Sequence, residues 1–261
     1  MRNSVTIRNI TIGDGVPKIC VSLVGGTPEG IREELGEFSP GSFSFQSAAS
    51  MQDVELVEFR ADHFTALESF EALDAMLREV RQAIGQRVLI FTIRSAREGG
   101  NALGFSKPDY YEINRHVIEN GLADLVDLEL FSENREEICA LIGLAHEKDV
   151  RVIMSSHDFD KTPENEEMMR RLLEMEKLGA DIAKLAVMPQ TKEDVERLML
   201  ITKQVETEIP VVTMSMGELG MVSRISGRET GSAFTFAALK KSSAPGQLPV
   251  AEMVKAIRGR G

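Results

Sequence analysis

Short apolar runs alternate with helix-like amphipathic segments along almost the whole chain, and this alternation restricts the possible folds more than any other feature. Eight apolar runs read as strands: Ile19–Val24, Asp53–Asp62, Val88–Arg94, Ala123–Leu130, Val150–Asp158, the run that contains Lys184, Pro210–Ser215 and Gly231–Ala237. Strands that alternate with helices form a parallel sheet with right-handed crossovers. Eight such units in 261 residues predict a (β/α)8 TIM barrel that forms a single domain, residues 1–261.

The N-terminal residues add a second element. Residues Val5–Ile12 alternate apolar and polar side chains on either side of Arg8-Asn9, which is typical of a β-hairpin. We expect this hairpin to close one end of the barrel. A doubly wound open sheet is the alternative fold, but it usually carries a glycine-rich phosphate turn after its first strand, and Gly25-Gly26 matches that turn poorly.

Capping residues predict where several helices begin. Thr27-Pro28 places a proline at the first position of one helix, while Thr162-Pro163 and Thr191 are predicted to cap two others. Apolar side chains at helical spacing predict a longer helix over Leu67–Ile84 that ends at Gly85.

The charge and composition exclude several classes of protein. With 30 basic and 41 acidic residues the net charge is −11, which argues against a general nucleic-acid binder but not against a small anionic substrate. No apolar run reaches about 18 residues and the N-terminus lacks an apolar signal core, so we expect no membrane span and a cytoplasmic enzyme. Cys20 and Cys139 are expected to be buried, reduced thiols, and no His or Cys cluster has the spacing of a metal site.

Lys184 interrupts the sixth apolar run, within the stretch GADIAKLAVMPQ. Burying an unpaired ammonium costs several kcal/mol, and burial in general favours the neutral amine. A desolvated amine is a nucleophile, and its commonest use is a Schiff base with a carbonyl substrate. The structural alternative is a lysine that extends its side chain from a strand end to solvent.

Two charged residues occupy the second predicted strand. Alternation places Glu58 and Arg60 on one face and Val57 and Phe59 on the other. Because the apolar pair suits the helix layer, the charged pair is predicted to point into the barrel. A structural ion pair between Glu58 and Arg60 is the alternative interpretation.

Further polar residues lie near the ends of other predicted strands. Arg94 ends the third strand and His157 lies at the end of the fifth, while Lys184 lies on the sixth. Barrel enzymes build their active sites at the carboxyl ends of their strands, so these residues predict one pocket. Taken singly, Arg94 could pair with Glu98 on the rim, and His157 could bond a neighbouring group.

The chain resembles type I 3-dehydroquinate dehydratase, the Schiff-base enzyme of the shikimate pathway, nearly from end to end. The resemblance lies in these motifs: PKICVSL (Pro17–Leu23), ELVEFRADHF (Glu55–Phe64), LIFTIRSAREGG (Leu89–Gly100), VIMSSHDFDKTP (Val152–Pro163), GADIAKLAVMPQ (Gly179–Gln190), SRISG (Ser223–Gly227) and KKSSAPGQLPV (Lys240–Val250). It implies dehydration of 3-dehydroquinate to 3-dehydroshikimate in aromatic amino acid biosynthesis, a homodimer, and neither a metal nor an organic cofactor.

The resemblance also implies roles for individual residues. Lys184 matches the imine-forming lysine, His157 the general acid and base, and Glu98 the carboxylate that orients this histidine. Substrate-binding positions are matched by Ser22, Glu58, Arg60, Arg94, Arg224, Ser243 and Gln247. Among these, Arg224 matches the arginine that holds the substrate carboxylate, and Ser243 and Gln247 match a loop that closes over the ligand.

The proposed chemistry sets electrostatic expectations. Glu98 is expected to fix the imidazole of His157 and to raise its basicity. The arginines are expected to supply positive charge that keeps the amine of Lys184 neutral and attracts an anion.

Two other functions remain possible from the residues alone. A class I aldolase also uses a lysine imine on this barrel, but aldolases that act on sugar phosphates usually carry a phosphate site of glycine-rich turns after the last two strands. A non-catalytic binding protein that kept the pocket is the other possibility. A fused second enzyme is not expected, because 261 residues leave no room for it.

Two segments depart from the family pattern. Arg228-Glu229-Thr230 stands where the family usually has a more apolar tripeptide, and Phe38–Met51 is unusually rich in serine. These departures concern the geometry of loops and leave the proposed chemistry intact.

Overall fold

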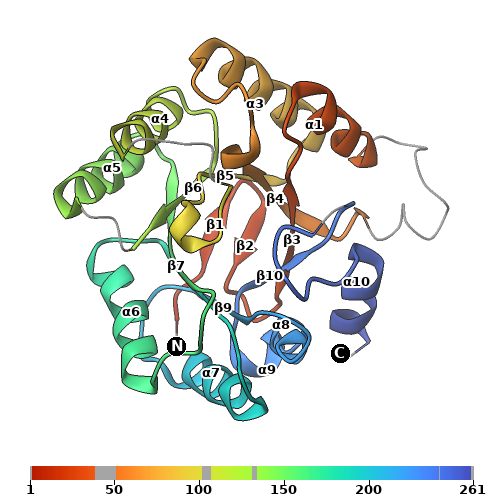
Figure 1. Cartoon of the computed structure of the whole chain (residues 1–261), viewed down its shortest axis with the longest axis vertical. Helices are drawn as coiled ribbons and strands as arrows, with labels where there is room; N and C mark the ends of the chain where they lie inside the picture. The colour runs from red at the N-terminus through yellow and green to blue at the C-terminus, as the bar shows by residue number, and fades with distance from the viewer. Residues whose placement is uncertain (1, 39–50, 102–106, 131–133, 241, 260–261) are drawn as a thin grey trace.

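Eight parallel strands form a barrel in the computed structural model, which describes residues 2–38, 51–101, 107–130, 134–240 and 242–259 (Figure 1). The strands are β3 (Lys18–Leu23), β4 (Val54–Arg60), β5 (Val88–Thr92), β6 (Leu125–Glu129), β7 (Arg151–Asp158), β8 (Ile182–Val187), β9 (Val211–Ser215) and β10 (Phe234–Ala237). They pair in the order β10-β3-β4-β5-β6-β7-β8-β9. The amide of Ala233 donates to the carbonyl of Val211 (2.8 Å) and brings the two edges together. The predicted barrel is confirmed.

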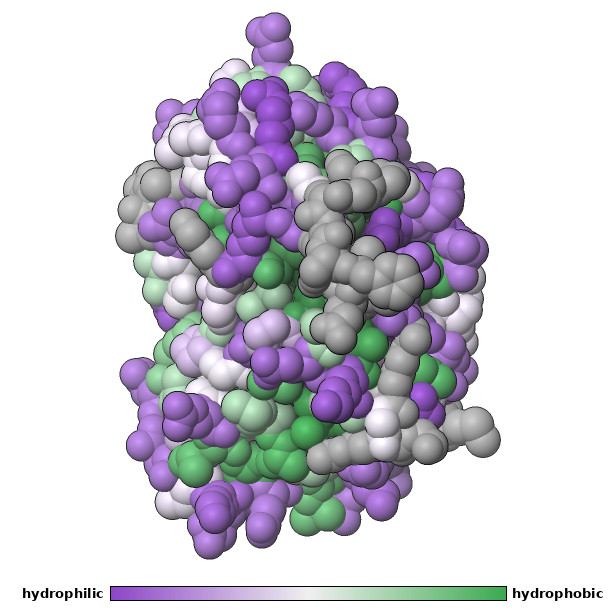
Figure 2. All heavy atoms as spheres, turned by 90° about the vertical axis from the view of Figure 1, so that its right-hand side faces the viewer, coloured by the Kyte–Doolittle hydropathy of each residue, from purple (hydrophilic) through white to green (hydrophobic). Residues whose placement is uncertain are grey.

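Helices surround the strands as an outer ring (Figure 1). They are α1 (Pro28–Leu35), α3 (Phe70–Ile84), α4 (Lys107–Glu119), α5 (Arg135–Glu147), α6 (Asn165–Lys177), α7 (Lys192–Gln204), α8 (Met221–Ile225), α9 (Gly227–Thr230) and α10 (Val250–Arg258). Each of the longer helices buries an apolar face against the sheet and presents polar side chains outward. Figure 2, which views the side of α1 and α10, shows this mixture as hydrophilic side chains with apolar ones between them.

The helix starts show which caps were predicted correctly. Thr191 caps α7 in a full capping box with Asp194, and Pro28 is the first residue of α1. The predicted start at Leu67 is wrong, because Ser69 accepts a hydrogen bond from the amide of Ala72 and α3 begins at Phe70.

Thr162 was predicted to cap α6, and this is also wrong. Glu164 occupies the capping position, and the hydroxyl of Thr162 donates to the carbonyl of Met188 (3.2 Å). The short helices α8 and α9 were not predicted, since their five and four residues are too few to show a helical period. Most of the serine-rich segment Phe38–Met51 lies outside the described residues.

The inside of the barrel consists of two layers. Toward the amino ends of the strands the inward side chains are apolar and include Leu56, Ile90 and Ile182. The next inward position on the same strands is polar, as at Glu58, Thr92 and Lys184. Val57 and Phe59 pack outward with the helix layer, so the predicted facing of the second strand is confirmed.

The N-terminal hairpin closes the apolar end of the barrel. Its strands β1 (Val5–Ile7) and β2 (Ile10–Ile12) pair antiparallel, and Ile7 and Ile12 pack into the inner apolar layer. In Figure 1 the hairpin is seen inside the ring of strands. With this end filled, the polar layer opens, as far as the described residues show, at the carboxyl ends of the strands.

Carboxylates just before the strands fix the pairing at the closed end. Asp124 accepts hydrogen bonds from the amide of Leu89 (2.8 Å) and from Arg8 and Arg81 (2.8 and 2.6 Å). It therefore joins the hairpin, α3 and two strands. Asp181 accepts from the amide of Val152 in the same way.

The two cysteines differ in exposure. Cys20 is buried inside the barrel, where burial raises the pKa of its thiol well above the ordinary value. Cys139 is exposed on α5, so the prediction that it is buried is wrong. In the described part of the chain, no helix has the length and hydrophobicity needed to cross a bilayer.

Replacing Asp124 by alanine should destabilise the barrel without affecting its open end. The substitution leaves the buried amide of Leu89 without its acceptor, which costs roughly 1–3 kcal/mol in the free energy of unfolding. Urea denaturation measures this loss, and Glu112→Ala on the exposed face of α4 is the control with little expected effect. Equal stability of the two variants would contradict the assigned role of Asp124.

Candidate active site

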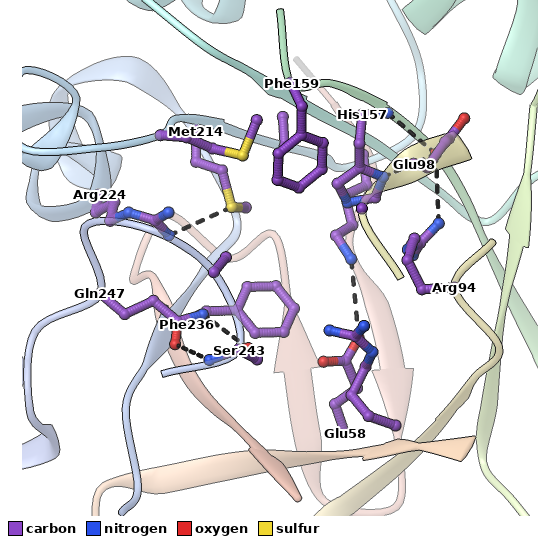
Figure 3. A pocket seen from close by; sticks show the side chains of 16 residues that line it. Glu58, Arg94, Glu98, His157, Phe159, Met214, Arg224, Phe236, Ser243 and Gln247 are labelled. Atoms are coloured by element: carbon purple, nitrogen blue, oxygen red, sulfur yellow. Dashed lines mark hydrogen bonds and ion pairs between the residues drawn. The ribbon is translucent and has the colours of Figure 1, made fainter. Parts of the chain in front are cut away.

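A cavity with an empty volume of about 450 Å³ opens at the carboxyl ends of the strands (Figure 3). Its lining includes nine of the ten site residues that the sequence predicted, namely Glu58, Arg60, Arg94, Glu98, His157, Lys184, Arg224, Ser243 and Gln247. Figure 3 shows His157, Glu98 and Arg94 on one side of the cavity and Arg224, Ser243 and Gln247 on the other. The side chains come from strands and loops that are far apart in the sequence.

Lys184 is 4% exposed and lies at the centre of the polar layer. Its Nζ donates to Asp127 Oδ2 at 2.9 Å and lies 3.9 Å from Glu58 Oε1. The ring of Phe236 lies 4.8 Å from the same nitrogen. The expectation of a predominantly cationic environment is therefore wrong: carboxylates are the charged groups in contact with the amine.

Glu58 connects the lysine to the far side of the cavity. Its Oε1 accepts from the hydroxyl of Thr92 (2.9 Å), and its Oε2 accepts from Ser22 (2.6 Å). Ser22 is also 3.0 Å from Ser243, whose backbone amide and hydroxyl bond the side chain of Gln247. Ser22 itself does not line the cavity and instead supports two residues that do.

His157 and Glu98 form a buried pair. The Nδ1 of His157 lies 2.9 Å from Glu98 Oε2, and the backbone amide of His157 donates to the same oxygen at 3.1 Å. The predicted contact is thus present. Glu98 lies on the short turn η3 (Ala96–Glu98), which follows β5.

The titration of this pair differs from the expectation. Burial, together with the positive charges of Arg94 and Lys184, holds the pKa of His157 well below its ordinary value. Burial and the charge of Glu129 raise the pKa of Glu98 to about 8. The expected rise in the basicity of His157 is wrong, because desolvation outweighs the carboxylate.

Two of the arginines are held by carboxylates. Arg60 donates two hydrogen bonds of 2.8 Å to Asp62. Arg94 contacts Asp127 (2.8 Å), Glu129 (3.1 Å) and Glu98 (3.4 Å) and also donates to Ser155 (2.8 Å). Their positive charges are therefore largely compensated within the protein.

Arg224 differs from them. It is 2% exposed, and its guanidinium donates to the carbonyl of Pro245 (2.9 Å) and contacts the sulfur of Met214 (3.5 Å). Its Nε has no hydrogen-bond partner, and no carboxylate of the described residues lies within ion-pair distance. Burial lowers its pKa to about 10, so the group remains charged at neutral pH. An unpaired buried cation beside a cavity is suited to an anionic ligand.

Several residues in or beside the site were not predicted from the sequence. Asp127 and Glu129 alternate on β6 as Glu58 and Arg60 do on β4, and that period was the signal that could have found them. The cavity also has apolar side chains in its wall, from Ala186 and from Phe159, Met214, Met216 and Phe236. These carry no sequence signal that distinguishes them from core residues. Among the described residues, no cluster of His, Cys, Asp and Glu has the arrangement of a metal site.

The unusual segment Arg228-Glu229-Thr230 lies away from the cavity. It belongs to α9 and lines a groove that also includes Arg2, Gly13 and Pro210, the residue just before β9. This groove is at the amino ends of the strands, so the departure from the family pattern does not affect the candidate site.

Comparison with known proteins decides the family. The model of the type I 3-dehydroquinase family matches residues 19–261. The chain belongs to this family. A 3-dehydroquinate dehydratase of Clostridium novyi (strain NT) is 44% identical over 253 residues, which cover 96% of this chain and 95% of the relative. The 3-dehydroquinate dehydratase of Salmonella typhimurium is 42% identical with the same coverage.

Solved structures of family members have the same barrel. One of them is the type I 3-dehydroquinate dehydratase of Clostridium difficile, crystallised with covalently modified comenic acid. It superposes on this chain with a TM-score of 0.90 at 39% sequence identity, and the match includes 100% of this chain and 98% of the other. The 3-dehydroquinate dehydratase of Geobacillus kaustophilus also superposes with a TM-score of 0.90, at 35% sequence identity, and the match includes 98% of this chain and 95% of the other. The fold and family inferred from the motifs are therefore confirmed.

Substituting Gly99 by alanine should disturb the turn that carries Glu98. Gly99 has φ = +78°, and an added Cβ would lie 2.3 Å from the ring of Phe159. The left-handed backbone and the clash should lower the free energy of unfolding by roughly 1–3 kcal/mol. Thermal and urea denaturation measure the change. Gly143→Ala, in the exposed middle of α5 with nothing near the added methyl, is the control and should be neutral or stabilising.

Proposed function

We propose that the chain converts 3-dehydroquinate to 3-dehydroshikimate by a syn elimination of water through an imine on Lys184. Family membership supports the activity, and the third step of chorismate biosynthesis follows from it. The roles of the individual residues are those that the family resemblance implies, and the geometry of the cavity supports them.

One observation carries the proposal. A buried amine, a buried imidazole–carboxylate pair and a buried unpaired guanidinium line the same cavity (Figure 3). The proposed substrate has a ketone, an acidic C–H next to it, a leaving hydroxyl and a carboxylate. Lys184 matches the ketone, His157 matches both the C–H and the leaving hydroxyl, and Arg224 matches the carboxylate. That correspondence favours this reaction over simple binding.

Lys184 is the nucleophile. Its Nζ donates a hydrogen bond to Asp127 Oδ2 at 2.9 Å, and the ammonium gives up a proton to water before attack. The neutral amine adds to the ketone, and loss of water gives a cationic imine. The new positive charge remains beside Asp127 and Glu58, which stabilise it, and it makes the adjacent C–H acidic.

His157 carries the proton through the elimination. Burial keeps the imidazole neutral at neutral pH, so it can take the proton from the carbon next to the imine and leave an enamine. The imidazolium formed is stabilised by Glu98, 2.9 Å from Nδ1. His157 then donates the same proton to the departing hydroxyl, and hydrolysis of the imine releases the product and restores Lys184.

Arg224 and the loop after β10 hold the substrate. Arg224 binds the substrate carboxylate, which supplies the anionic partner that the guanidinium lacks. Ser243 and Gln247 lie next to it and are already linked to each other by two hydrogen bonds. Glu58, Arg60 and Arg94 complete the polar wall and bind substrate hydroxyls, while Ser22 keeps Glu58 and Ser243 in position.

The alternatives fit the cavity less well. A sugar-phosphate aldolase needs a phosphate site after the last two strands, whereas here that region contributes side-chain donors, Arg224, Ser243 and Gln247. A binding protein has no need for a base such as His157 beside the amine. Absorbance of the conjugated enone product separates dehydration from both alternatives.

We further propose that the chain acts in the cytoplasm as a homodimer of single-domain subunits, without metal or organic cofactor. Resemblance to the family supports the dimer, and the origin of all lining residues in one barrel supports the single domain. Sedimentation velocity tests the assembly, and a monomer at working concentrations would exclude the dimer.

Borohydride reduction in the presence of 3-dehydroquinate should fix the ligand covalently on Lys184. Reduction converts the imine to a stable amine, and peptide mass spectrometry then locates the added mass. Lys184→Ala should show no adduct and no turnover. An adduct on another residue, or none in the wild type under turnover, would remove the imine mechanism.

The His157→Ala variant serves as the matched comparison. It retains Lys184 and should still give the reduced adduct, but it should form 3-dehydroshikimate at most at a rate reduced by a factor on the order of 100 or more. Normal turnover by this variant would show that another group is the base.

Replacing Arg224 by lysine should weaken substrate capture. The lysine keeps the positive charge but cannot bind a carboxylate through two parallel hydrogen bonds, so kcat/KM should fall on the order of 100-fold. Arg228→Lys, at an exposed position of α9, is the matched control and should behave as the wild type. A loss confined to kcat, with KM unchanged, would contradict the binding role of Arg224.

A further inference from the structure

Glu129 is a buried carboxylate for which the mechanism above has no use. It lies at the carboxyl end of β6, its side chain is 11% exposed, and it does not line the cavity. Its Oε1 accepts hydrogen bonds from the amide of Ser95 (2.8 Å) and from Arg94 Nη1 (3.1 Å). Its own amide donates to the hydroxyl of Tyr110 (3.1 Å). Every one of these contacts is internal, so Glu129 can act on the reaction only through other residues.

Arg94 connects Glu129 to the catalytic pair. The same nitrogen, Nη1, contacts Glu129 at 3.1 Å and Glu98 at 3.4 Å. Glu98 in turn contacts His157 at 2.9 Å (Figure 3). Glu129 and Glu98 therefore share one positive group, and each carboxylate reduces the stabilisation that Arg94 gives to the other.

The buried charges around this group do not balance. Around Arg94 and Lys184, four carboxylates contact two cations: Glu58, Glu98, Asp127 and Glu129 against Arg94 and Lys184. The neighbouring Arg60 and Asp62 neutralise each other. With all six ionised and His157 neutral, the cluster would carry two uncompensated negative charges. Such charges are costly in a dry interior, so the cluster retains a proton.

The surroundings of Glu98 place this proton. The charged and titratable groups that act on Glu98 are Arg94 after β5, Asp127 and Glu129 on β6, and His157 on β7. Lys184 on β8 and Arg60 on β4 act on His157, and Tyr110 on α4 interacts with Glu129. Asp127 stays ionised, since Arg94 and Lys184 outweigh the effect of burial and hold its pKa below the usual range. The pKa of Glu98 is raised to about 8, by burial first and then by Glu129.

The state of Glu98 matters because His157 becomes a cation when it takes a proton. An ionised Glu98 stabilises the imidazolium, and a neutral Glu98 does not. We propose that Glu129 is a positioning residue that competes with Glu98 for Arg94 and so sets the pH above which the Glu98–His157 pair works as a base. The inference rests on the proposed roles of Glu98 and His157 and goes beyond them.

The sign of the effect follows from the charges. Glu129→Gln removes a like charge from the vicinity of Glu98 and frees Arg94 to bind it. Both changes favour ionised Glu98. The acid limb of the kcat profile, which is the pH range in which kcat falls as the pH is lowered, should therefore move to lower pH by about one unit or more. A merely structural residue would lower kcat without moving the limb.

Two matched variants separate charge from packing. Glu129→Asp keeps the carboxylate and should leave the acid limb near its wild-type position. Tyr110→Phe removes the hydroxyl that accepts the amide of Glu129, with no change of charge, because burial raises the pKa of Tyr110 well above its ordinary value. It should also leave the limb in place. An unmoved limb in Glu129→Gln, or a limb moved to higher pH, would overturn the proposal.

A measurement on the unaltered protein tests the proposal even if the variants fold poorly. Carbon NMR of wild-type protein labelled at the glutamate carboxyls should show one buried carboxyl that titrates near pH 8. The Glu98→Gln variant serves only to assign this signal, which should be absent from its spectrum. If every glutamate of the wild type titrates in the ordinary range, the inference fails. Turnover by His157→Ala would instead refute the proposed function, so the two failures are distinguishable.

Discussion

A lysine ammonium enclosed in a parallel barrel is the constraint on which the rest of this structure depends. Lys184 is 4% exposed, and its charge is tolerable only because Asp127 and Glu58 lie within 4 Å. Those carboxylates are buried as well and need donors of their own, which Arg94, Ser155, Thr92 and Ser22 provide. The polar layer is thus one network, and a change in any of its charges alters the protonation of the others.

The barrel supplies this network because of how its strands alternate. The lower inward positions form an apolar layer that the hairpin covers, and the next inward positions on β3 to β8 carry polar side chains, whereas β9 and β10 contribute the apolar Met214 and Phe236. Neighbouring strands place residues such as Ser155 and Lys184 side by side in register. The strands thus bring these side chains together directly, while the short helices η3 and α8 add Glu98 and Arg224, and loops add Arg94, Ser243 and Gln247.

The sequence alone was enough to predict the fold and to name most of the polar residues that line the cavity, for reasons that particular residues make plain. Glu58, Arg60 and Lys184 stood out because charge is rare inside apolar runs, and the motifs identified the loop residues. Asp127 and Glu129 follow the same period but were read as an ordinary strand. The capping error at Thr162 and the exposure of Cys139 arose because local sequence does not show which tertiary partner is present. The direction in which His157 titrates depends on burial and on Arg94, a residue 63 positions away in the chain.

The central claim is that one cavity binds an anionic ketone covalently at Lys184 with its carboxylate on Arg224. A crystal structure of the borohydride-reduced complex with 3-dehydroquinate tests both ends of that claim at once. The account predicts continuous density from Nζ of Lys184 into the ligand, with the ligand carboxylate paired to the guanidinium of Arg224 and His157 next to the reacting carbon. A ligand that is not joined to Lys184, or whose carboxylate lies away from Arg224, would contradict it.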